Sequence, residues 1–111
     1  MIYVPSPYLL KDTLPFKLTT NHLLVFGYLV GKAEKENRLY GEHQGTIEAS
    51  YTEIMPFVRK SRRFMSDCMD KLEANKMIKR HIITGTVTMY ELLPSSNYFD
   101  ADKIKEEGNV L

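Results

Sequence analysis

The chain has 111 residues, of which 43% are hydrophobic and 26% charged, and its formal net charge is +1. This composition is typical of one globular domain that buries a core without disulfides or structural metals. The longest apolar run, residues 23–30, is too short to span a bilayer, and prolines interrupt the segment where a signal peptide would lie. We therefore expect a cytoplasmic protein with no membrane partner.

Residues 1–18 contain three prolines and several large apolar side chains. Prolines discourage regular secondary structure beyond short pieces, whereas so much apolar surface would not stay in water. We predict an ordered arm, packed either on its own domain or on a second subunit.

The first predicted helix covers residues 20–36, with Thr19 or Thr20 as its cap, an apolar stripe that includes Leu23 and Phe26, and Asn37 as a left-handed stop. A polar loop follows, and then a short strand over residues 46–50.

The second predicted helix covers residues 52–58. Ser50 and Glu53 fit a capping box, but that cap would place Pro56 inside the helix, where it removes a hydrogen bond. Thr52 as the cap keeps Pro56 near the first turn, so we favour Thr52.

The third predicted helix covers residues 62–75, with Ser61 as its cap. Met65, Cys68, Met69 and Leu72 have the spacing of one apolar helical face. Arg62, Arg63 and Ser66 point away from that face, at the N-terminal end of the helix.

A β-hairpin is predicted over residues 79–92, with its bend at Gly85, because two alternating β-branched runs flank the glycine. We expect the strand at 46–50 to pair with this hairpin. Residues 100–107 are expected to form one or two helical turns that end at Gly108.

This order of elements predicts an α+β winged helix-turn-helix with three main helices and a C-terminal β-hairpin wing. Its parts are an arm (1–18), the winged domain (19–93) and a tail (94–111).

The charge is unevenly distributed. Residues 59–81 hold eight Lys or Arg and three Asp or Glu, a net charge of +5, whereas the rest of the chain carries −4. Such polarisation indicates a surface for an anionic partner, and the alternative is a solvated charged helix face. In helix-turn-helix proteins the N-terminal end of the second helix meets base edges.

We therefore predict binding to double-stranded DNA, with Arg62 and Arg63 contacting bases. The predicted DNA-binding residues are Arg59, Lys60, Ser61, Arg62, Arg63, Ser66, Lys79, Arg80 and His81, the last three on phosphates beside the wing. The wing tip, residues 84–86, is uncharged, and Phe64 is expected to pack in the core or turn.

Enzymatic chemistry has no support in the sequence. His22, His43 and His81 lack metal-ligand spacing, and Cys68 is the single cysteine, expected to be a buried hydrophobe. Asp67 and Asp70 are better explained by ion pairs within their helix than by acid–base catalysis. We expect no enzyme, no cofactor and no metal.

The chain resembles the N-terminal domain of plasmid replication initiators of the Gram-positive RepA type over residues 3–93. The similarity lies in Tyr3-Val4-Pro5-Ser6-Pro7-Tyr8-Leu9-Leu10, in the first helix from Leu18-Thr19-Thr20, and in the segments Glu36-Asn37-Arg38-Leu39-Tyr40-Gly41 and Ser50-Tyr51-Thr52-Glu53-Ile54. The resemblance implies a winged-helix homodimer that binds repeated sites at a replication origin.

Three roles remain open. The favoured role is a DNA-binding initiator or accessory protein of replication on a plasmid, phage or mobile element. A transcriptional repressor would use the same surface residues. A protein-binding adaptor of a replication complex gains from Asp67 and Asp70, because carboxylates on the recognition helix weaken attraction to phosphate. Self-association is expected to use the arm and the first helix.

Overall fold

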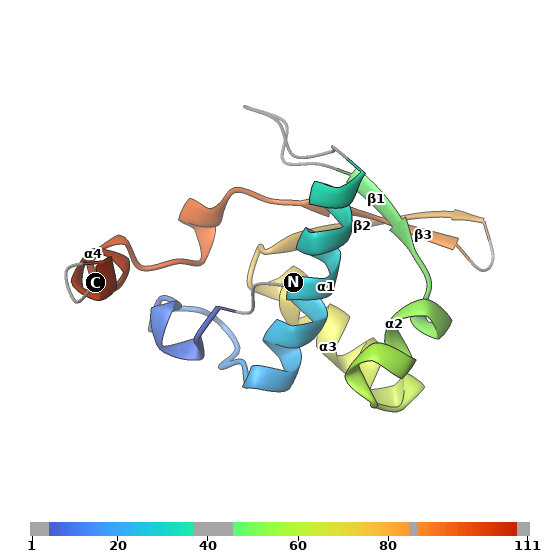
Figure 1. Ribbon diagram of the computed structural model, residues 1–111, viewed down its shortest axis with the longest axis horizontal. Coiled ribbons are helices and arrows are strands. Elements are labelled where there is room, and N and C mark those ends of the chain that lie inside the picture. The colour runs from blue at the N-terminus through green and yellow to red at the C-terminus, as the bar shows by residue number, and fades with distance from the viewer. Residues whose placement is uncertain (1–4, 37–45, 85–86, 109–111) are drawn as a thin grey trace.

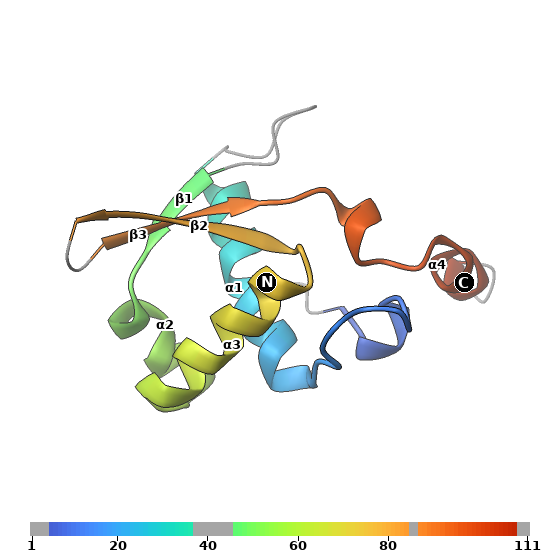
Figure 2. The same ribbon diagram turned by 180° about the vertical axis from the view of Figure 1, so that it is seen from behind.

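The computed structural model describes residues 5–36, 46–84 and 87–108. It is an α+β fold in which a three-stranded antiparallel sheet, in the order β1-β3-β2, lies along helices α1, α2 and α3 (Figure 1). A fourth helix, α4 (Ala101–Gly108), lies at one end of the long axis, and α2 lies toward the other (Figure 2). No helix of the described part is long and apolar enough to cross a membrane.

Helix α1 (Thr20–Lys35) begins after Thr19 and is largely buried. The Nδ1 atom of His22 accepts a hydrogen bond from the backbone N–H of Thr19 at 2.9 Å, which satisfies a donor at the helix start. Leu23 and Phe26 of the predicted stripe are buried, as expected. The predicted stop at Asn37 lies outside the described residues, as do the rest of the polar loop and His43.

Strand β1 (Thr46–Ala49) pairs with β3 (Val87–Leu92), which in turn pairs with β2 (Ile78–Thr84). The predicted hairpin and its pairing with the earlier strand are therefore confirmed. Residues 85–86 of the predicted wing tip lie outside the described part, so the contacts of the tip stay a prediction.

Helix α2 (Tyr51–Val58) corrects one prediction, because its cap is Ser50 and not Thr52. The Ser50 hydroxyl accepts from the Glu53 N–H at 3.2 Å, and the Glu53 carboxylate accepts from the Ser50 N–H at 3.4 Å. The complete capping box offsets the hydrogen bond that Pro56 removes inside the helix.

Helix α3 (Arg62–Ala74) buries Met65, Cys68, Met69 and Leu72 completely, so its predicted apolar face is confirmed. These side chains join those of α1 and the sheet in one core. The Cys68 thiol donates to the carbonyl of His22 at 3.8 Å, and burial raises its pKa to about 12. It is a packing residue, as predicted.

The arm packs against the tail of its own chain. Leu9, Leu10 and Leu18 are buried, and Leu10 forms an isolated antiparallel bridge with Phe99. Two backbone hydrogen bonds form this bridge: the Lys11 N–H donates to the Tyr98 carbonyl at 2.9 Å, and the Asp100 N–H donates to the Leu9 carbonyl at 2.8 Å. At least part of the arm therefore covers its own core.

Candidate nucleic-acid interface

The turn between α2 and α3 consists of three residues, and its backbone is held at both ends. Arg59 ends α2 in the left-handed conformation, with φ 55° and ψ 46°, and its N–H donates to the Met55 carbonyl at 2.8 Å. The Ser61 hydroxyl accepts from the Phe64 N–H at 3.2 Å and so caps α3. Lys60, between them, is displayed at the surface of this turn.

The structure brings the first six predicted DNA-binding residues together at this turn and along the first turns of α3. All of them are exposed: Arg59, Lys60, Ser61, Arg62, Arg63 and Ser66. The remaining three predicted residues lie apart from this group, on β2.

Two cations of this surface form cation–π contacts with aromatic rings. The Lys60 Nζ lies 5.7 Å from the centre of the Phe64 ring, and the Arg62 guanidinium lies 5.7 Å from the centre of the Tyr51 ring. Phe64 itself is half-buried and stacks on His22 with 5.3 Å between ring centres, so its predicted packing role is confirmed. Sequence reasoning missed Tyr51, because its proximity to Arg62 depends on how α2 and α3 cross.

The carboxylates of α3 have partners within the protein. Asp67 pairs with Lys71 at 3.0 Å, one turn along the helix, as predicted. Asp70 was expected to pair within α3 as well, but it pairs with Arg80 of β2 at 2.7 Å. The same guanidinium bonds Glu73 at 2.8 Å, and the Arg80 N–H donates to Glu73 at 3.0 Å.

The pKa shifts of Glu73 and Arg80 have the same origin. Burial alone would raise the pKa of Glu73, but the hydrogen bonds from the Arg80 backbone and guanidinium outweigh it and lower that pKa. Burial would lower the pKa of Arg80, and its bonds to Glu73 and Asp70 raise it instead. The Arg80 side chain thus links β2 to α3 through its bonds to Asp70 and Glu73.

The other two predicted residues of β2 differ from each other. Lys79 is exposed. The His81 Nε2 lies 3.1 Å from a carboxylate oxygen of Glu91 on β3, and both side chains are exposed.

In the described part of the chain, cations without a carboxylate partner lie near the start of α3, and paired carboxylates lie farther along the helix. Within the described residues, none of Arg59, Lys60, Arg62 and Arg63 lies within ion-pair distance of a carboxylate. Farther along the helix, Asp67 pairs with Lys71, while Asp70 and Glu73 share the one guanidinium of Arg80. The uncompensated positive charge therefore gathers at the N-terminal end of α3, where the helix dipole adds to it.

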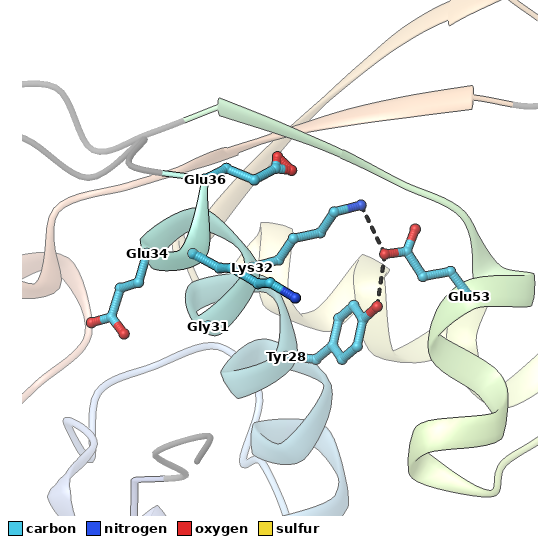
Figure 3. A pocket seen from close by; sticks show the side chains of 7 residues that line it. Tyr28, Gly31, Lys32, Glu34, Glu36 and Glu53 are labelled. Carbon is cyan, nitrogen blue, oxygen red and sulfur yellow. Dashed lines mark hydrogen bonds and ion pairs between the residues drawn. The ribbon is translucent and has the colours of Figure 1, made fainter.

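A second polar cluster lies between α1 and α2, in an open pocket (Figure 3). The Glu53 Oε2 accepts from the Tyr28 hydroxyl and from the Lys32 Nζ, each at 2.7 Å. Burial and the bond to Glu53 raise the pKa of Tyr28 to about 12. Because Glu53 also belongs to the capping box of α2, this cluster ties α1 to the start of α2.

Among residues 5–36, 46–84 and 87–108, no group of three or more His, Cys, Asp or Glu side chains is arranged to hold a metal ion. Comparison with family models, curated proteins and solved structures finds no match to the chain.

Proposed function

We propose that this chain is a sequence-specific DNA-binding protein of the winged helix-turn-helix type. In this proposal α3 lies in the major groove and the β2–β3 hairpin is the wing. The order of helix, strand, helix, three-residue turn, helix and hairpin supports it. A major groove is about 12 Å wide and admits one α-helix, and the exposed start of α3 presents side chains that suit such a groove.

One observation carries the proposal. Four cations in the α2–α3 turn and at the start of α3 have no carboxylate partner among the described residues, while the acids of the same helix are paired internally. The internal pairing also weakens the case for a protein-binding adaptor, because Asp67 and Asp70 already have partners within the protein. Arg62 and Arg63 are proposed to contact bases, each giving about 1–3 kcal/mol of discrimination if bidentate to guanine. Arg59 and Lys60 are proposed to bind phosphates, with Lys79 as the strongest remaining candidate on β2.

The test is selection of binding sites from random duplexes, followed by fluorescence anisotropy at increasing salt. The double reversal R62E/R63E is expected to abolish the selected specificity. Loss of a phosphate contact at Arg59 or Lys60 is instead expected to make the plot of log affinity against log salt less steep. Each phosphate contact contributes about 0.9 to that slope. The matched control is K35E/K105E, which makes the same change in net charge at exposed residues of α1 and α4.

Two results would contradict the proposal. One is a pool in which no sequence is enriched and the salt slope is near zero, which would favour the adaptor role. The other is a specificity that R62E/R63E leaves intact, which would exclude this surface.

The proposed biological role is initiation or support of replication on a plasmid, phage or mobile element, and it rests on the resemblance to RepA-type initiators. A repressor would bind DNA through the same residues. The genomic positions of the selected sequence distinguish these two roles. Repeated sites beside helicase or primase genes favour replication, and a site within a divergent promoter favours repression.

A homodimer is part of the proposal, because two copies can bind two half-sites while one small domain binds a duplex weakly. Sedimentation that gives a monomer at tens of micromolar would remove the dimer from the proposal.

A further inference from the structure

A groove of about 390 Å³ is lined by residues of the arm and by Lys103 of α4. The arm and α4 lie on the other side of α1 from the α2–α3 turn (Figures 1 and 2). Its apolar lining includes the buried Leu10 and Leu18 and the half-buried Leu14. Tyr8 and Phe16, which are 55% and 43% exposed, also line it. Two large aromatic side chains thus remain accessible around one apolar floor.

The walls of the groove are fixed by hydrogen bonds. The Lys103 Nζ of α4 donates to the Leu10 carbonyl at 3.1 Å and to Asp12 at 2.8 Å, and it lies 5.2 Å from the Tyr8 ring centre. The backbone of Phe16, another lining residue, is held by the buried Asn75 side chain, which accepts from the Phe16 N–H at 3.0 Å and donates to the Phe16 carbonyl at 2.9 Å. The groove therefore exists before any partner binds, which lowers the entropy cost of binding.

The rim of the groove is positive. Lys11 and Lys17 line it, and within the described residues neither forms an ion pair. The single acid in the lining, Asp12, is paired with Lys103, so three cations face one carboxylate. An apolar centre with a charged rim is the usual composition of a protein interface.

We infer that this groove binds an acidic, amphipathic peptide segment of a partner protein. Apolar side chains of the peptide pack against Phe16, Tyr8 and the leucine floor, while its carboxylates lie near Lys11 and Lys17. A polar small molecule is a poorer fit, because such ligands are oriented by convergent polar groups inside a pocket, and Lys103 is already occupied by Asp12. The site is independent of the proposed DNA surface, so both can be filled together.

The probe is a phage-displayed library of random peptides selected on the full chain, followed by anisotropy with the enriched peptides. Enriched peptides are expected to combine Asp or Glu with Phe, Leu or Trp. Phe16→Ala is expected to weaken their binding about 10-fold or more, as for an aromatic anchor. Its matched control is Phe57→Ala, which removes a ring of similar exposure (46%) from α2.

The rim is tested by charge. Lys17→Glu is expected to weaken peptide binding by up to about 5-fold, an effect of the size seen for exposed ion pairs, and to lose that effect at high salt. Lys35→Glu makes the same charge change away from the groove and serves as the control. DNA binding, measured in parallel, is expected to be unchanged by Lys17→Glu, so failure here differs from failure of the DNA proposal.

Three results would overturn the inference. The first is a library that yields no acidic and apolar consensus. The second is peptide binding that Phe16→Ala and Lys17→Glu leave at the level of their controls. The third is a dimer in sedimentation that Phe16→Ala dissociates, because the groove would then be filled by a second copy.

Discussion

Replacing Arg59 by glycine is expected to have opposite effects on the stability of the fold and on DNA binding. Arg59 has φ 55° and ψ 46°, and the hydrogen bond from its N–H to the Met55 carbonyl holds this conformation. The left-handed region costs an L-residue about 1–2 kcal/mol, which glycine avoids. Glycine loses about 0.5–1 kcal/mol through the greater freedom of the unfolded chain. The Arg59→Gly variant is therefore expected to be as stable as the wild type or up to about 1.5 kcal/mol more stable.

The same substitution is expected to weaken DNA binding. Arg59 is exposed, and its guanidinium has no carboxylate partner in the described part of the chain. Loss of one phosphate contact lowers the salt slope by about 0.9. Arg59→Ala is the matched control, because it removes the same charge and keeps a Cβ in the left-handed conformation. It is expected to show the same DNA defect without the gain in stability.

Urea unfolding followed by far-ultraviolet circular dichroism measures the first effect, and anisotropy at several salt concentrations measures the second. A glycine variant less stable than the alanine variant would refute the strain argument. An unchanged salt slope in both variants would remove Arg59 from the proposed interface, whatever their stabilities.

Four further predictions concern stability and reactivity. Asn75→Ala is expected to lower the free energy of unfolding by about 2–4 kcal/mol, because it removes both hydrogen bonds to the Phe16 backbone. The control Asn97→Ala removes one exposed hydrogen bond and should lower it by less than about 1 kcal/mol. Equal losses in the two variants would contradict the role of Asn75. Burial lowers the pKa of His22, so stability is expected to fall as pH decreases below about 6.5. His22→Gln can still accept from Thr19 as a capping glutamine, and it should make stability less dependent on pH. A dependence of the urea midpoint on pH that is unchanged in this variant would show that His22 is not its source. Glu53→Gln is expected to cost about 1–2 kcal/mol, since it weakens bonds from Tyr28 and Lys32, and a loss below about 0.3 kcal/mol in urea unfolding would show the cluster to be dispensable. Cys68, fully buried with a raised pKa, should react with a thiol reagent only as fast as the protein unfolds, and faster labelling would show local opening around α3.

Local patterns were sufficient to predict helices α1 and α3 and the β2–β3 hairpin. The spacing of Met65, Cys68, Met69 and Leu72 is a property of one helix, so it needs no knowledge of what the helix packs against. The cap of α2 was predicted wrongly because the hydrogen bond lost at Pro56 was given more weight than the capping box of Ser50 and Glu53. The Glu53 carboxylate completes the capping box and also accepts from Tyr28 and Lys32 of α1, and those contacts exist only once α1 is packed.

The candidate site divides in the same way. The clustering of cations around the start of α3 follows from the sequence, because the residues are adjacent in the chain and the apolar face leaves them outside. Which charges remain uncompensated could not be predicted, since Asp70 and Glu73 find Arg80 across a gap in sequence that only the packing of β2 closes.

The sequence by itself determined the helices and strands, their order, the buried face of α3 and the clustering of cations around the start of α3. Each of these features depends on residues that are close together in the chain. The tertiary structure decided which acids are neutralised, which ring supports Arg62, and that the arm and tail form one groove. Those features join residues far apart in the chain, such as Lys103 and Asp12, and their pairing is set by the packing of the whole core rather than by any local pattern.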